Sequence, residues 1–113
     1  MKTANLYSGL EYNPEKPIVN VLFETSFTKE IRIAMQEGTL MKEHKTSFPI
    51  VVEVVAGVVD FGVNNETLHL EKGNLIALEP NVPHDLKAIK NSVIRLTLTK
   101  NDQTSRVQDV ASK

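Results

Sequence analysis

Two histidines are the residues of this chain whose type and placement point most directly to chemistry. His44 and His84 each stand in a segment that begins at a glycine turn, at Gly38 and at Gly73, and continues into a strand-like stretch. An imidazole at neutral pH binds divalent metals, transfers protons or hydrogen-bonds to a ligand. The two segments read as two walls of one small β-barrel. We therefore expect the two rings to meet inside it.

Short stretches with β-strand character follow one another along the chain and supply these walls. Residues 29–35 and 93–99 alternate apolar and polar side chains with the period of a half-buried strand. The expected strands are Ile18–Phe23, Lys29–Met35, a strand from Leu40, Ile50–Val55, Val58–Val63, Thr67–Leu70, Leu75–Leu78, Leu86–Ile89 and Val93–Thr99. Asn64 and Asn65 predict a two-residue hairpin turn, because asparagine tolerates positive φ. No helical periodicity longer than a turn or two is present, and this predicts an all-β sandwich or barrel.

Strand parity predicts which side chains line the barrel. The face of His44 is expected to carry Leu40, Lys42 and Thr46, with Met41, Glu43 and Lys45 opposite. The predicted pocket consists of Leu40, Lys42, His44, Thr46, Ile50, Val52, Leu78 and His84. Lys42 is open to two interpretations: it pairs with an acidic ligand, or its ammonium reaches solvent at the rim. His69 and Arg95 are expected on the surface.

Length and composition bound the class of protein. With 113 residues, 41% hydrophobic and 24% charged, the chain suits one globular domain with a core over residues 18–99 and a polar tail over 100–113. The formal charge of −1, with scattered Lys and Arg, argues against nucleic-acid binding. The absence of cysteine excludes disulfides and thiolate metal sites. No apolar run of membrane-spanning or signal-peptide length appears, so we expect no membrane insertion and a cytoplasmic location.

The two histidine segments resemble those of the cupins, small jelly-roll barrels with a double-stranded β-helix. In the first segment, Gly38, His44 and Gly57 have the spacing of the family motif. In the second, the matching residues are Gly73, Asn74, Pro80, Pro83 and His84. The segments cover residues 38–57 and 73–84, and the flanking strands extend the likeness over about 18–99. The resemblance is to a small, single-domain, conserved-barrel cupin.

The metal motif of the family is degenerate here. Mapped by position, the family's metal ligands fall on His44, Thr46, Ile50 and His84, so a histidine and a carboxylate are lost. Glu53 is no evident substitute, because it points away from the face of Ile50 unless a bulge intervenes. Two readings remain open. One is a weak two-histidine site for Fe, Mn, Zn or Ni; the other is a pair of pocket histidines without metal.

An apolar outer strip favours a homodimer. Glu53 lies on the outer face between Val51 and Val55, and exposed apolar strips of this kind mark partner surfaces. Cupins of this size commonly pair through such sheets. The alternative is that the N-terminal strand of the same chain covers the strip.

Three functions follow from these observations. The first is a cupin that binds a sugar, a small acid or a saccharide without a tightly held metal and without a classical cupin enzyme activity. The second is a metal-dependent enzyme, a dioxygenase or isomerase, that uses His44 and His84. The third is a pure interaction module. No Ser-His-Asp arrangement, phosphate loop or carboxylate pair suggests a hydrolase or a kinase.

Overall fold

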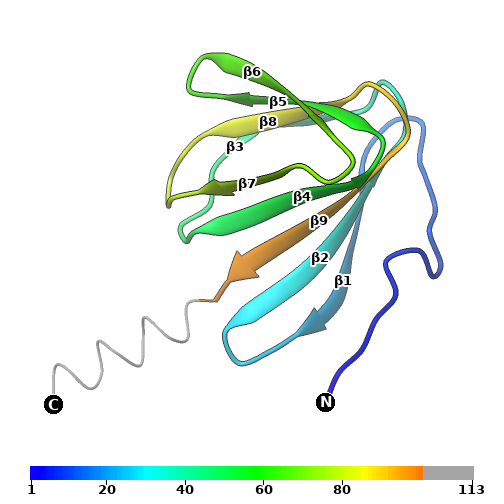
Figure 1. The fold of residues 1–113 in the computed structure, drawn as a ribbon, viewed down its shortest axis with the longest axis vertical. Coiled ribbons are helices and arrows are strands. Elements are labelled where there is room, and N and C mark those ends of the chain that lie inside the picture. The colour runs from blue at the N-terminus through cyan, green and yellow to red at the C-terminus, as the bar shows by residue number, and fades with distance from the viewer. Residues whose placement is uncertain (101–113) are drawn as a thin grey trace, which may run out of the picture.

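Nine antiparallel strands form the described part of the protein. The computed structural model describes residues 1–100, and the expected tail lies outside them except for Lys100. The strands are β1 (Ile18–Glu24), β2 (Thr28–Met35), β3 (Leu40–His44), β4 (Ile50–Ala56), β5 (Val58–Val63), β6 (Glu66–Glu71), β7 (Leu75–Leu78), β8 (His84–Ala88) and β9 (Ser92–Thr99). The all-β fold is confirmed (Figure 1). Within residues 1–100 no helix is long and apolar enough to span a membrane.

The strands divide between two sheets that enclose one core. The larger sheet has the order β1-β2-β9-β4-β7, and the smaller has the order β3-β8-β5-β6. Alternation puts one face of each strand inside; in β5, for example, Val59, Phe61 and Val63 are buried. These residues pack with the inner residues of β2, β4, β8 and β9 in one cluster. Such interdigitated apolar faces are the main stabilising contribution in a two-layer β fold.

The two ends of the barrel differ (Figure 1). The sheets converge at the end that holds the β4–β5 turn, and they diverge toward the end where β3, β5 and β7 finish. We call this open end the mouth; the connections 45–49, 64–65 and 79–83 form it. Two of these connections are tied together, since the Asn81 amide donates to the Thr46 carbonyl at 2.7 Å.

Local chemistry explains the turns at both ends. Asn64 and Asn65 have φ of 52° and 62°, as a type I′ hairpin turn requires, so the predicted turn is confirmed. Gly57, with φ of 91°, makes the β4–β5 turn. A Cβ at position 57 would lie 2.4 Å from the Asn91 carbonyl oxygen, and because that oxygen belongs to the backbone, the main chain would have to shift to remove the clash.

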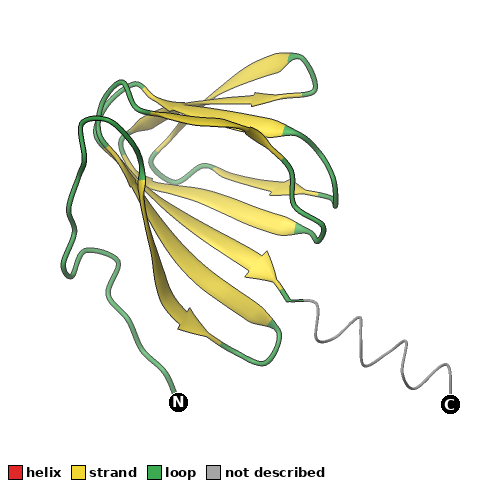
Figure 2. Ribbon diagram, turned by 180° about the vertical axis from the view of Figure 1, so that it is seen from behind, coloured by secondary structure: helices red, strands yellow, loops and turns green. Residues whose placement is uncertain are grey.

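A buried arginine holds the N-terminal segment against the larger sheet. Arg32 is only 4% exposed, on the opposite face of β2 from Ile31 and Ile33. Its guanidinium donates to the carbonyls of Leu6 and Ser8 at 3.0 and 2.7 Å. The coil of residues 1–17 therefore runs outside the barrel, beside the larger sheet (Figure 2).

The predicted face of β3 needs a correction. Leu40 is 56% exposed and Lys42 is exposed, whereas Met41 packs against the core. The pairing of β3 with β8 shifts register between Met41 and His44. A bulge of this kind reverses side-chain parity, so Met41 and His44 share the inner face although they are three residues apart.

The outer face of β4 is more polar than the sequence analysis expected, because Glu53 has a charged partner there. Glu53 lies on the outer face as expected, but its carboxylate accepts from the Arg95 Nε at 3.1 Å. Val51 is 37% exposed and Val55 is half-buried. The apolar side chains of this strip are thus partly buried within a single chain.

Candidate functional site

The two histidines meet at the mouth. His44 at the end of β3 pairs with His84 at the start of β8. Their ring centroids are 4.3 Å apart, with an angle of 59° between the ring planes. Two segments forty residues apart in sequence thus bring their imidazoles into contact, as the glycine-led segments predicted.

Backbone carbonyls fix the tautomer of both rings. The Nδ1 atoms lie 2.7 Å from the Lys42 carbonyl oxygen in His44 and 2.9 Å from the Val82 carbonyl oxygen in His84. A carbonyl oxygen only accepts, so each Nδ1 carries the proton and each neutral ring keeps its lone pair on Nε2. In the neutral form of either ring, the acceptor is therefore Nε2.

His84 is the buried member of the pair. It is 3% exposed, and its ring stacks on Phe61 with centroids 5.5 Å apart and planes within 7°. Burial lowers the pKa of His84 below its ordinary 6.5, and the neighbouring His44 lowers it further. The Val82 carbonyl and the Asp85 carboxylate oppose this shift without reversing it. The His84 ring is consequently neutral at pH 7.

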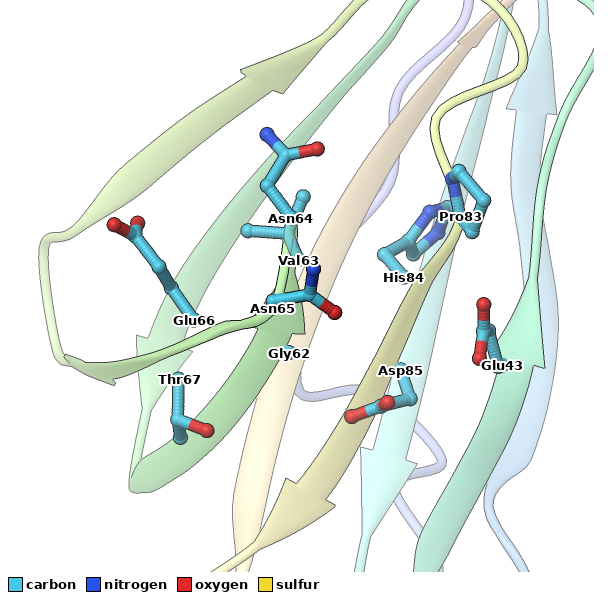
Figure 3. A pocket seen from close by; sticks show the side chains of 10 residues that line it. All are labelled: Glu43, Gly62, Val63, Asn64, Asn65, Glu66, Thr67, Pro83, His84 and Asp85. Carbon is cyan, nitrogen blue, oxygen red and sulfur yellow. The ribbon is translucent and has the colours of Figure 1, made fainter.

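A cavity of about 430 Å³ adjoins His84 (Figure 3). The β5–β6 hairpin forms one side, β8 the other, and a β3 side chain reaches in. The lining residues are Glu43, Gly62, Val63, Asn64, Asn65, Glu66, Thr67, Pro83, His84 and Asp85. Most of these side chains present oxygen atoms, and three of them are carboxylates. A cavity of this size suits one small organic molecule.

The missing side chain of Gly62 makes room for one of the carboxylates. Gly62 pairs with Asp85 across β5 and β8. A Cβ at Gly62 would lie 2.5 Å from the Asp85 Oδ1. The Asp85 carboxylate therefore lies over the Gly62 backbone and borders the cavity from there.

Of the eight pocket residues predicted from sequence, His84 lines this cavity. His44 contacts His84 from the neighbouring strand. The predicted apolar lining, Ile50, Val52 and Leu78, is buried at 2, 4 and 8% exposure within the core. The remaining three are Leu40 and Lys42, which are exposed, and Thr46, whose hydroxyl donates to the Phe48 carbonyl oxygen at 3.0 Å.

Sequence reasoning did not place the three carboxylates or the β5–β6 hairpin at the lining of this cavity. One usable signal was present: an acidic residue is adjacent to each histidine, as Glu43-His44 and His84-Asp85. The contribution of Glu66 and Thr67 depends on the position of the β5–β6 hairpin beside β8 in the smaller sheet. No local pattern in the sequence reports that position.

Few side chains in residues 1–100 could join the two histidines as metal ligands. Among residues 1–100, no three His, Cys, Asp or Glu side chains converge as a metal site. At the positions of the two lost ligands, the Thr46 hydroxyl is engaged with a carbonyl and Ile50 is hydrocarbon. Catalytic zinc and non-haem iron sites generally use three protein ligands, and here two imidazoles are available.

Comparisons with known proteins place this fold. Residues 29–101 match the AraC-like ligand binding domain. A search of curated proteins gives no match. An RmlC-like cupin protein from Desulfovibrio desulfuricans superposes with a TM-score of 0.80 at 16% identity, over 88% of this chain and 96% of that one.

Two further solved structures show the same architecture. A conserved protein with a double-stranded β-helix domain from Klebsiella pneumoniae has a TM-score of 0.76 at 16% identity, covering 88% and 89% of the two chains. KdgF from Halomonas has a TM-score of 0.67 at 17% identity, covering 76% and 82%. These structures share the cupin fold, and the sequence match covers more than half of the chain. The chain belongs to the family of AraC-like ligand binding domains.

Proposed function

We propose that this protein binds a small organic molecule at the mouth of the barrel, next to His84. The observation that carries the proposal is a buried imidazole at the wall of a 430 Å³ cavity. Its Nδ1 donates to the Val82 carbonyl oxygen, which leaves Nε2 as the hydrogen-bond acceptor of the neutral ring. A hydroxyl or ammonium of a bound ligand can donate to that atom.

The construction of the site supports binding rather than catalysis. Phe61 holds the His84 ring from one side, and the Val82 carbonyl fixes its tautomer. The ring is thus an immobile acceptor that needs no reorganisation when a ligand arrives. Sugars, saccharides and small acids were the candidates from sequence; the oxygen-rich lining agrees best with a molecule that has many donors.

The test follows the His84 ring by NMR. Neutral sugars, polyols, amines and small carboxylic acids are added in turn to the full chain at millimolar concentration. We expect one class to shift the His84 ring resonances and those of the Asn64–Asn65 amides. His69, which is exposed on β6, is the control histidine and should not respond.

Variants of the same histidines sharpen the result. His84→Gln keeps a polar side chain of similar length and is expected to abolish the shifts, whereas His69→Gln is expected to leave them unchanged. A thermal unfolding curve for each variant separates lost binding from lost fold. If every class fails to move the mouth resonances, or if His84→Gln binds as wild type does, the proposal is wrong.

A metal titration tests the enzyme alternative in the same protein. Fe²⁺, Mn²⁺, Zn²⁺ and Ni²⁺ are added to wild type and to His84→Gln. We expect weak binding at most, because two imidazoles without a carboxylate form an incomplete ligand set. Stoichiometric binding that survives dialysis and disappears in His84→Gln would favour the dioxygenase or isomerase reading.

The homodimer stays a prediction. Sedimentation at decreasing concentration measures it, and Val51→Lys places a charge on the outer face of β4, where Val51 is 37% exposed. A dimer that dissociates in this variant supports the predicted strip. A monomer at all concentrations rejects it.

A further inference from the structure

The strand β1, at one edge of the larger sheet, exposes apolar side chains on the side that faces the core elsewhere (Figure 1). Val19 and Val21 are 50 and 54% exposed. Their partners on β2 are Ile33 and Ile31, which are buried at 3 and 6% exposure. The two valines therefore continue the inner face of the sheet to a place that one chain leaves uncovered. Neighbouring apolar side chains left open in this way indicate a partner surface.

β1 is also the least protected of the four sheet edges. The sheet orders make β1, β7, β3 and β6 the edge strands. β3 carries charged residues in its interior, β6 carries one at each end, and β7 has four residues. β1 has seven residues, and its one charged residue is the last, Glu24. Long uncharged edges pair readily with a strand of another chain, because their outward backbone N–H and C=O groups need partners.

The N-terminal segment does not supply a strand for this edge. It is held by Arg32 on the outer face of β2, the side opposite to that of Val19 and Val21. Among residues 1–100, no backbone hydrogen bond joins residues 1–17 to β1. A side-chain contact, from the Lys2 ammonium to the Glu24 carbonyl oxygen, lies at the end of the strand.

The sequence of β1 is complementary to itself in one antiparallel register. A two-fold axis at Asn20 places Val19 of each copy opposite Val21 of the other, with all four valines on the same face of the joined sheets. The same register brings Lys16 of each copy near Glu24 of the other. Opposite charges thus meet at both ends of the strand pair, and this complementarity favours a second copy over an unrelated strand.

We propose that a second copy of this chain pairs with β1 in this register, so that two five-stranded sheets become one continuous sheet. This surface is distinct from the outer strip on β4, where Val51 is only 37% exposed. It is also independent of the ligand proposed for the mouth. The paired segment is short, and interfaces that bury less than about 1,200 Å² are generally transient. We therefore expect a reversible dimer that dissociates in the micromolar range.

A matched pair of valine variants tests the surface. Val21→Lys places a charge at the centre of the proposed interface, and Val51→Lys places the same charge on β4. Both side chains are exposed, so both variants are expected to fold, which thermal unfolding checks. In sedimentation equilibrium we expect Val21→Lys to weaken the dimer by about tenfold or more, and Val51→Lys to leave it unchanged. Equal weakening by both variants, or a wild type that is monomeric at every concentration, overturns the proposal.

A charge swap tests the register. Lys16→Glu and Glu24→Lys each put like charges opposite one another, and at low salt each should weaken the dimer by about threefold or more. Glu24→Lys also removes the contact with Lys100, so the double variant is decisive. It restores opposite charges and should dimerise more tightly than either single variant; if it does not, the register is wrong. Lys72→Glu, in the exposed turn after β6, is the control and should dimerise as wild type does.

Amide hydrogen exchange tests the backbone pairing itself. In the proposed dimer, the β1 amides that point away from β2 are bonded to the second copy. We therefore expect their exchange to slow as the protein concentration rises. The control is β7, the other edge of the same sheet, where exchange should not depend on concentration. A dimer that leaves the β1 amides unprotected, or that protects β7 instead, overturns the assignment of β1 as the paired strand.

Discussion

Charged side chains on the outer face of the larger sheet and those at the mouth have opposite surroundings. On the larger sheet, Arg95 lies 3.1 Å from the Glu53 carboxylate and 3.6 Å from that of Glu30. Thr97 adds a hydroxyl that donates to Glu30 at 2.6 Å. At the mouth, Glu43, Glu66 and Asp85 border a cavity with no such partners within residues 1–100.

The difference separates structural charges from charges that are available to a ligand. The cross-strand register places Arg32 opposite Arg95 on β9, and Arg95 opposite Glu53 on β4. Arg95 is satisfied by Glu53 and Glu30, and Arg32 by carbonyls of the N-terminal segment, so these charges offer little to a ligand. The mouth carboxylates gain nothing from one another, so any compensating charge has to come from outside. Changes to the two regions should therefore affect different properties.

The largest loss of stability is expected from Arg32→Met. Arg32 donates to three backbone carbonyls of the N-terminal segment and, at 3.0 Å, to the side-chain oxygen of Asn20. Removing a buried charged donor leaves acceptors without partners, at a cost of about 2–4 kcal/mol in the free energy of unfolding. Urea unfolding of wild type and of Arg32→Met measures this loss of stability.

The control for Arg32 is an arginine that is less buried. Arg95→Met, on the neighbouring strand and 39% exposed, should cost clearly less. If both variants lose the same stability, burial is not what distinguishes the two arginines. Any ligand-induced shift of the His84 ring resonances should be unchanged in Arg32→Met wherever the protein stays folded, because Arg32 does not line the mouth cavity.

Much of this architecture was accessible from sequence because strand periodicity and turn chemistry are local. The alternation in residues 29–35 and the Asn64–Asn65 turn each depend on a few neighbouring residues. The meeting of His44 with His84 also followed, since both segments begin at glycine turns and lead into the same barrel. These signals predicted the all-β cupin fold and one wall of the cavity.

The cavity itself depends on non-local geometry that the sequence does not display. The bulge between Met41 and His44 reverses the parity of β3 and moves Leu40 and Lys42 to the exposed side. Glu66 joins the site because the β5–β6 hairpin lies beside β8, and Asp85 because Gly62 leaves room for its carboxylate. Each of these depends on a neighbouring strand. Residue types and strand parity alone therefore predicted a different set of lining residues from those that border the cavity beside His84.

An acid-dependent loss of stability is the next expected effect. Burial lowers the pKa of His84 in the folded chain, so the unfolded chain binds that proton more readily. The resulting stabilisation is present above the unfolded pKa of about 6.5, and it is lost as pH falls through the lower folded value. Unfolding free energies of wild type and His84→Gln from pH 7.5 down to 5 should converge for this reason.

His69→Gln is the matched control for that pH dependence. His69 lies on the outer side of β6, exposed, with its Nδ1 against the Asp60 carboxylate. Its variant should keep the acid-dependent loss that wild type shows. An NMR titration that gives His84 a pKa of 6.5 or higher contradicts the assigned burial effect.

A smaller effect is expected for the pair on the larger sheet. A double-mutant cycle with Glu53→Gln and Arg95→Met isolates their interaction, which should be about 0.5–1 kcal/mol, since Arg95 is partly exposed and screened by water. A coupling energy near zero would mean that this pair is no more engaged than the mouth carboxylates, and the contrast between the two regions would disappear.

The smallest effect on stability is expected from replacing the mouth carboxylates. Replacing Glu43 and Glu66 with glutamine and Asp85 with asparagine removes three negative charges that border one cavity. No partner within residues 1–100 loses a contact, and mutual repulsion falls, so the free energy of unfolding should rise or stay constant within about 0.5 kcal/mol. Residues that cost stability yet remain at a cavity are typical of binding sites, because selection for a ligand outweighs a small gain in stability. A triple variant that unfolds more easily than wild type would show instead that these carboxylates support the fold, as Glu30 and Glu53 do on the larger sheet.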